Sequence, residues 1–265
     1  MVAPCTAGTL AAVSSENAEP DNPGNPSGSS VPPSQDSPFQ HENVDRDTAP
    51  QFVLPLVVRI EKTAPPARTD ALETAARAVL TLLGDERSVG EGEWARAVSD
   101  WQDARIRKVV RRARGAEWRK ASALPGITVT GRECEVRVFP PVPLDGWPKE
   151  LAKLQVSGTD LEDPEPPAQP AAGVPMLWLS PEVEMSAGKA MAQAGHGAQL
   201  AWWELSDADR TEWAKAGFPL AVRSADAERW ANLASSGLPV VRDAGFTEIE
   251  AGSRTVIADH PALHR

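Results

Sequence analysis

The sequence predicts an α/β fold of two related halves, each a small mixed sheet with helices packed on its faces. Three observations predict it. Short apolar runs of strand type alternate with runs whose apolar residues recur at helical spacing. The same order of elements occurs twice along the 265 residues. The N-terminal stretch, residues 1–50, is rich in Pro, Ser, Asn and Gly, and it cannot bury enough apolar surface to offset chain entropy.

The acidic charge is concentrated in the segments that are poorest in apolar residues. The formal net charge is −10, yet residues 1–50 carry seven acids against one base and residues 160–175 carry four acids and no base. The rest of the chain is neutral in sum. We therefore interpret 1–50 as a disordered, acidic Pro/Ser-rich tail and 160–175 as a linker between two halves, residues 51–159 and 176–265.

The first half begins with a buried-type strand over Gln51–Glu61, in which Pro55 favours a bend or an edge position. Apolar residues at helical spacing then predict a helix over Thr69–Leu83, with Asp70 as a capping residue. For the remainder we expect helices at Trp94–Asp103 and Ala116–Leu124, and strands at Arg105–Val110, Ile127–Val129 and Glu135–Phe139.

The second half repeats this order. We expect strands at Met176–Leu179, Pro219–Val222, Pro239–Arg242 and Arg254–Ala258, and helices at Ala187–Leu205, Ala208–Ala216 and Ala225–Ser235. Each half holds a pair of tryptophans with the same spacing, Trp101 and Trp118 in the first and Trp213 and Trp230 in the second. Because tryptophan is scarce, this repeated spacing indicates an internal duplication in which Trp101 corresponds to Trp213.

Composition limits the setting of the protein. No apolar run approaches the length that a transmembrane helix needs, so none is expected, and the first residues lack the basic start of a secretory signal. Cys5 and Cys134 make no disulfide framework. These features favour a cytoplasmic location.

Polar side chains recur at fixed spacing in two short stretches of the second half. Lys189, Gln193 and His196 follow at i, i+4 and i+7, so on a helix they share one face. Ser186 can cap that helix, whose start offers free backbone N–H groups to an anion. Asp243 follows a short strand, and carboxylates at strand ends of α/β sheets often face ligands.

The two stretches together resemble the type 2 peptidyl-tRNA hydrolases, over roughly Met176 to Asp259. The matching residues are Gly188-Lys189, Gln193, His196, Asp243-Ala244-Gly245, Thr247, Ile249, Gly252-Ser253 and Thr255-Val256. Two features depart from the pattern. Ala251 stands where a proline is usual, and the closing Gly-x-Leu-Lys strand is not found up to Arg265.

The resemblance implies hydrolysis of the ester that joins a nascent peptide to the terminal ribose of tRNA. Such a reaction needs a positioned water and donors for the developing oxyanion. We expect Asp243 to act on the water, Lys189 with the first-turn amides to hold the oxyanion or a phosphate, and Thr247 to position the carbonyl or ribose. Further substrate-binding candidates are Gly188, Gln193, His196, Ser253 and Thr255. No metal or other cofactor is expected.

Several of these residues also have a purely structural interpretation. Lys189 is of the type that most often lies solvated at the surface, and Asp243 before Ala-Gly suits an Asx turn. Thr247 can donate to substrate or to its own loop. His196 can serve only as a helper that bonds a neighbouring loop, and Ser253 can be a turn hydroxyl.

The first half lacks this chemistry. Its helix begins without Gly-Lys, Gln or His, and Gly131 stands where the offset between the tryptophan pairs places the counterpart of Asp243. We interpret this half as a degenerate, non-catalytic repeat that takes the place of a partner subunit, which makes the chain a monomeric pseudo-dimer. Its basic run, which includes Arg111, Arg112 and Arg114, is the candidate for tRNA contact. Two other functions stay open: a non-catalytic tRNA- or ribosome-binding protein, and a hydrolase of another acyl or aminoacyl ester.

Overall fold

The computed structural model describes residues 50–264, so almost all of the predicted tail, with Cys5, lies outside them. Nine strands are found in this range: β1 (Phe52–Arg59), β2 (Arg107–Ala113), β3 (Ile127–Thr130), β4 (Glu135–Val138), β5 (Val142–Pro143), β6 (Met176–Leu179), β7 (Ala221–Ser224), β8 (Val240–Arg242) and β9 (Arg254–Asp259). The same range contains seven α-helices: α1 (Arg68–Leu83), α2 (Ala95–Asp103), α3 (Gly115–Ser122), α4 (Lys149–Ala152), α5 (Ala187–Glu204), α6 (Asp207–Lys215) and α7 (Ala227–Ala234). Short 3-10 turns occur at Glu86–Ser88 and Pro261–His264.

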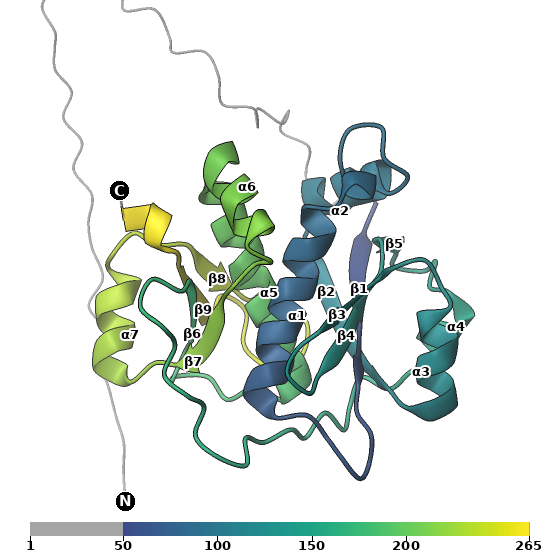
Figure 1. The fold of residues 1–265 in the computed structure, drawn as a ribbon, viewed down its shortest axis with the longest axis horizontal. Coiled ribbons are helices and arrows are strands. Elements are labelled where there is room, and N and C mark those ends of the chain that lie inside the picture. The colour runs from purple at the N-terminus through teal and green to yellow at the C-terminus, as the bar shows by residue number, and fades with distance from the viewer. Residues whose placement is uncertain (1–49, 265) are drawn as a thin grey trace, which may run out of the picture. The chain divides into compact units, whose positions relative to one another are not determined.

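The strands form two mixed sheets (Figure 1). Sheet A has the order β2-β1-β4-β3, with β5 also pairing with β1, and sheet B has the order β7-β6-β9-β8. The predicted α/β class is confirmed, and the ends of the predicted elements shift by no more than three residues. Strand β5 and helix α4 were not expected. No helix of residues 50–264 has both the length and the apolar character that crossing a membrane requires.

Pro55 does not mark an edge, because β1 lies inside sheet A between β2 and β4. The antiparallel partner of β1 changes along its length. Phe52 and Val53 pair with β5, whereas Leu56 and the two residues after it pair with β4. Pro55 falls between these two sets, where the loss of a backbone donor interrupts neither antiparallel ladder.

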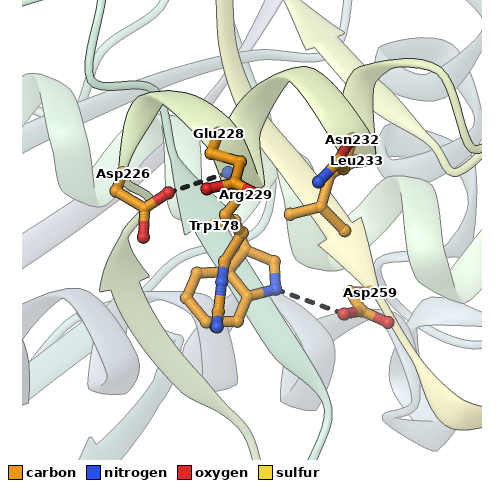
Figure 2. A pocket seen from close by; sticks show the side chains of 7 residues that line it. All are labelled: Trp178, Asp226, Glu228, Arg229, Asn232, Leu233 and Asp259. Atoms are coloured by element: carbon orange, nitrogen blue, oxygen red, sulfur yellow. Dashed lines mark hydrogen bonds between the residues drawn. The ribbon is translucent and has the colours of Figure 1, made fainter.

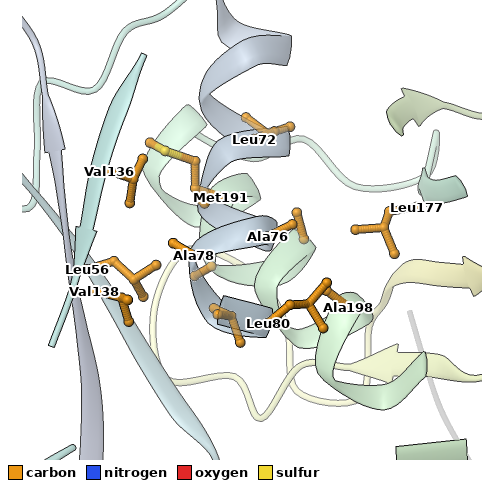
Figure 3. Packing of buried hydrophobic residues seen from close by; sticks show 14 of the residues in the cluster. Leu56, Leu72, Ala76, Ala78, Leu80, Val136, Val138, Leu177, Met191 and Ala198 are labelled. Atoms are coloured by element: carbon orange, nitrogen blue, oxygen red, sulfur yellow. The ribbon is translucent and has the colours of Figure 1, made fainter. Parts of the chain in front are cut away.

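Helices α1 and α5 pack against each other between the two sheets, as Figures 1 and 3 show. Small residues on both helices, among them Ala76 and Ala198, let the backbones approach, and larger side chains reach the sheets. Figure 3 shows this core, with Leu56, Val136 and Val138 of sheet A on one side of the two helices and Leu177 of sheet B on the other. Gly195 is required here, since a Cβ at this position would lie 2.9 Å from Val79 Cγ2. The two halves therefore share one hydrophobic core.

The outer faces of the sheets carry smaller helices. Trp118 of α3 and Leu151 of α4 pack on Val57 of sheet A, and Trp230 of α7 packs on Ile257 of sheet B. Each sheet is thus covered by helices on both faces (Figure 1).

The two sheets share their strand order and their strand directions. In each, the first strand along the chain pairs in parallel with the second and antiparallel with the fourth. The buried indole of Trp101 donates from Nε1 to the carbonyl oxygen of Arg107 at 2.8 Å, and Trp213 donates in the same way to Pro219 at 2.9 Å. Both tryptophans therefore anchor the chain at the start of the second strand or just before it.

The predicted linker is anchored to the starts of both central helices. Asp163 accepts from the backbone N–H and the hydroxyl of Thr69 in α1, at 2.8 and 2.6 Å. Thr159, just before the linker, accepts from the N–H of Gly188 in α5 at 2.9 Å. These bonds satisfy first-turn donors that a helix cannot satisfy itself.

Candidate active site

Lys189 lies in the first turn of α5 and reaches across to the loop after β8. Ser186 caps the helix as predicted, because its Oγ accepts from the N–H of Lys189 at 3.2 Å. The Nζ of Lys189 donates to Asp243 Oδ2 at 2.6 Å and to Thr247 Oγ1 at 2.9 Å. Both charged side chains are largely buried, at 11% and 8% exposed. Lys189 is therefore not a solvated surface lysine.

Asp243 is held by its own loop as well as by Lys189. Its Oδ1 accepts from the N–H of Gly245 at 2.8 Å, which is an Asx turn. Gly245 has φ of +76°, a conformation that glycine adopts without strain. The Asx turn expected for Asp243 is thus present, and it fixes the direction of a carboxylate that contacts Lys189.

Gln193 connects this cluster to sheet B. Its Nε2 donates to Asp243 Oδ2 at 2.7 Å, and its Oε1 accepts from the hydroxyl of Thr255 in β9 at 2.6 Å. Both Gln193 and Thr255 are buried. Because the two bonds fix both ends of the amide, Thr255 orients Gln193 and, through it, Asp243.

A cavity of about 510 Å³ opens on this cluster. The predicted site residues that line it are Gly188, Lys189, Gln193, His196, Asp243 and Thr247. Ser253 and Thr255 are not among its lining residues. Ser253 instead accepts from the N–H of Asp243 through its backbone oxygen at 2.9 Å. The other wall of the cavity comes from the first half, over residues 105–110.

Two first-turn amides of α5, expected to hold an oxyanion or a phosphate, are engaged within the chain. The N–H of Gly188 donates to Thr159 and the N–H of Lys189 donates to Ser186, so neither is available to an oxyanion. The absence of a side chain at Gly188 accommodates Thr159, since a Cβ there would lie 2.9 Å from Thr159 Oγ1. These two amides therefore add no donor for substrate beyond those of the side chains.

His196 contacts a residue that the sequence did not point to. Lys108 of β2 is buried, and its Nζ lies 2.5 Å from Gln199 Oε1 and 3.2 Å from His196 Nδ1. Burial lowers the pKa of Lys108, and burial together with the charges of Lys108 and Lys189 lowers the pKa of His196. A neutral His196 fixed from the first half is a positioning group, as its helper interpretation implies. The basic residues of β2 come in two adjacent pairs, and the sequence gave no signal that Lys108 points inward.

The corresponding place in sheet A is closed. Asp70 does not cap α1 but lies in its first turn, where its carboxylate accepts from the N–H groups of residues 132–134 at 2.7–3.0 Å. Counted from the helix start, Asp70 corresponds to Lys189. Gly131 corresponds to Asp243, and a side chain at Gly131 would clash with Asp70. The acid on the helix and the glycine on the loop thus leave no paired cluster here.

Three arginines of the basic run that were predicted to contact tRNA, Arg111, Arg112 and Arg114, lie beyond the part of β2 that lines the cavity. Arg111 donates to the backbone oxygens of Ala152 and Leu154, and Arg112 donates to Ser157 and to the side chain of Gln155. Arg114 directly precedes α3. Two of the three arginines are therefore engaged within the chain, and their contact with tRNA stays a prediction.

A second hollow lies between α7 and sheet B (Figure 2). Trp178 forms part of its lining and donates from Nε1 to Asp259 at 3.2 Å, while Arg229 stacks on its ring. Asp226 caps α7 by accepting from the N–H of Arg229. Three of the four charged residues of this hollow, Asp226, Arg229 and Asp259, are thus used in local structure. Within residues 50–264 no three His, Cys, Asp or Glu side chains gather in a way that could hold a metal ion.

The comparison with protein families agrees with the geometry. The catalytic-type cluster lies wholly within the second half, where Lys189, Gln193, Asp243, Thr247 and Thr255 form one hydrogen-bonded network. A search of the curated proteins finds no match to the chain. Residues 176–265, the C-terminal part, match the model of the family described as peptidyl-tRNA hydrolase PTH2, the family that their motifs resemble.

Proposed function

We propose that this protein hydrolyses the ester bond of peptidyl-tRNA, and that Lys189, Asp243 and Thr247 carry the reaction. The observation that supports this best concerns the hydrogen bonds among these three residues. These bonds leave further donor and acceptor positions open for substrate and water. Oδ2 of Asp243 accepts two bonds, whereas Oδ1 accepts one. Since a carboxylate oxygen offers about two acceptor positions, Oδ1 keeps one for a water molecule.

Lys189 and Thr247 supply the donors. The ammonium group has three N–H bonds, and within the described chain two of them point to Asp243 and Thr247, which leaves one for substrate. Thr247 is exposed and accepts through its oxygen, so its own proton can be donated. One acceptor beside two donors is what addition of water to an ester carbonyl needs.

The reaction then follows from these positions. A water held by Asp243 Oδ1 adds to the carbonyl carbon of the peptide ester as its proton passes to the carboxylate. Lys189 and Thr247 donate to the oxygen that becomes negative. When the tetrahedral intermediate collapses, the bond to the ribose oxygen breaks, and the proton moves from Asp243 to that oxygen. The products are a free peptide and a tRNA with an intact 3′ hydroxyl.

The test is hydrolysis of a labelled N-acetylated aminoacyl-tRNA by the purified protein. We expect Lys189→Ala and Asp243→Ala each to lower kcat/KM by ~10²-fold or more, since each removes a group that acts in the transition state. Arg119→Gln is the matched control, because it removes an exposed charge of α3 that does not line the cavity. Turnover like that of the wild type in either Ala variant would rule out this assignment.

The same assay separates the two other functions. A tRNA-binding protein without catalysis would bind the substrate and release no peptide. A hydrolase of other esters would cleave an aminoacyl-tRNA without the acetyl group, or a simple acyl ester, at least as fast. The predicted cytoplasmic location agrees with a substrate that arises during translation.

We also infer that the halves arose by duplication and that the first occupies the place of a partner subunit. The common strand order and the two equivalent tryptophan anchors support this inference. So do the helices, because α2 and α3 precede α6 and α7 by the offset that separates Trp101 from Trp213, and they have the same lengths. A monomeric mass in sedimentation at enzyme concentrations would agree with a pseudo-dimer, whereas a stable dimer would contradict it.

A further inference from the structure

The mouth of the catalytic cavity carries an exposed aromatic ring between cationic side chains. Phe246 lies in the loop after β8, directly before Thr247, and is 56% exposed. The guanidinium carbon of Arg107 lies 4.1 Å from the centroid of this ring, and that of Arg105 lies at 5.9 Å. We call these three side chains the mouth platform. A ring so exposed beside a cavity is available to stack with a flat ligand.

The platform joins the two halves of the chain. Phe246 belongs to the half with the catalytic cluster, whereas Arg105 and Arg107 belong to the other half, and all three line the cavity. The Nε of Arg107 is buried and has no hydrogen-bond partner within the described residues. Because this Nε is inaccessible to solvent, a ligand would reach Arg107 through the terminal part of its guanidinium group, which lies against Phe246.

The charge of the cavity differs from that of the chain. Its lining includes five Lys and Arg residues and only two acidic ones, Asp243 and Glu248, although the sequence as a whole has a net charge of −10. Asp243 is paired with Lys189, and Glu248 accepts from the backbone and the hydroxyl of Ser186 at 3.0 and 2.7 Å. The mouth therefore favours an anionic ligand.

We propose that the mouth platform binds the single-stranded 3′ end of the tRNA, with a base stacked on Phe246 and a phosphate held by Arg107. Single-stranded RNA is recognised by such a combination of aromatic stacking and guanidinium contacts. This proposal rests on the proposed function, and it assigns RNA contact to a different part of the first half than the run at Arg111, Arg112 and Arg114. Because Phe246 precedes Thr247, a base on this ring places its ribose near the catalytic cluster.

The experiment measures binding without turnover, so that it does not depend on catalysis. Two RNA hairpins that copy a tRNA acceptor stem are compared by fluorescence anisotropy, one with the unpaired 3′ CCA end and one with a blunt end. We expect Phe246→Ala to weaken binding of the first hairpin by ~5- to 100-fold, the loss that removal of a stacking platform causes, and to leave the blunt hairpin unaffected.

Arg107→Gln tests the phosphate contact. We expect it to weaken binding of the CCA hairpin and to lower the slope of log Kd against log salt by ~0.7, the contribution of one phosphate on a single strand. Arg107→Lys should restore the slope but not the full affinity, because lysine keeps the charge and loses the planar stacking. Arg119→Gln on α3 is the control for removing one charge from the first half.

The outcomes separate this proposal from the proposed function. If the wild type binds both hairpins equally, or if Phe246→Ala and Arg107→Gln bind like the wild type, the platform does not hold the RNA end, whatever the hydrolase activity. If binding requires the platform but no peptidyl-tRNA is hydrolysed, the platform stands and the catalytic proposal fails.

Discussion

Replacement of Thr255 by valine tests whether the buried network orients Asp243. Thr255 is fully buried, and its hydroxyl donates to Gln193 Oε1 at 2.6 Å. Valine has nearly the same shape and cannot donate, so the amide oxygen of Gln193 is left buried without its partner. This costs about 1–3 kcal/mol of unfolding free energy. The amide then loses its fixed orientation, and we expect kcat to fall by ~3- to 30-fold while KM changes little.

A double-mutant cycle gives the sharper result. Gln193→Met alone removes the partner of both Thr255 and Asp243, whereas the double variant with Thr255→Val removes both ends of the buried bond. We expect the double variant to be more stable than the sum of the single losses implies, by about 0.5–3 kcal/mol. Urea unfolding followed by tryptophan fluorescence measures all four proteins.

The control is the same substitution in an exposed strand position, Thr130→Val in β3, which should change stability by no more than about 0.5 kcal/mol. Two results would refute the reasoning. One is a loss below about 0.5 kcal/mol for Thr255→Val, and the other is strict additivity with Gln193→Met. Either would mean that Thr255 and Gln193 do not act as a unit, and that Asp243 is oriented by its turn and Lys189 alone.

Three further predictions concern stability. Asp70→Ala should lower the unfolding free energy by about 3 kcal/mol in urea titrations, since three N–H groups lose a charged acceptor, while kcat is unchanged. Trp101→Phe and Trp213→Phe should each cost about 2–3 kcal/mol, from a lost hydrogen bond and lost volume; a large difference between them would argue against equivalent anchors. His196 has a lowered pKa, so its contribution to stability is fully present above its ordinary pKa of 6.5 and is lost as pH falls towards the folded value. His196→Gln should therefore flatten the decline of Tm below pH 6.5, and an unchanged pH profile would contradict a neutral imidazole in the folded protein.

The parts of the site that local sequence spacing determines were predicted correctly. Lys189, Gln193 and His196 share a helix face because of the helical period, and Asp243 follows a strand because the chain turns at Ala-Gly. Asp243 is distant in the sequence from this helix. The prediction that it lies beside this helix face rested on the family resemblance and not on the helical period. The structure adds that Thr255, expected to bind substrate, does not line the cavity and donates its hydroxyl to Gln193.

The errors arise where distant segments meet. Asp70 has the residue type of a helix cap and lies near the predicted helix start. Its carboxylate instead accepts from three N–H groups of a loop far along the chain, and local sequence does not predict that contact. Lys108 stands in a run of basic residues, and alternation in a strand does not tell which of them points to a neighbouring helix. Its contact with His196 depends on how α5 packs against β2, which no local pattern encodes.

The closed counterpart in sheet A explains how a half without the cluster can still belong to the site. Asp70 and Gly131 remove the paired side chains there, yet the same half contributes Lys108 behind His196 and Arg107 at the mouth of the cavity. The first half can lack the catalytic-type cluster and still supply a wall of the cavity, because the cluster and the wall are formed by different elements. Residues of the cluster lie at the start of α5 and in the loop after β8, the third strand of sheet B. Residues of the wall lie on β2, the second strand of sheet A, and just before it. Under the duplication that we infer, the first half would have lost its own cluster while its second strand became part of the other half's cavity. Substitutions at Arg107 should therefore weaken substrate binding more than they lower stability, and substitutions at Asp70 should lower stability more than they weaken substrate binding.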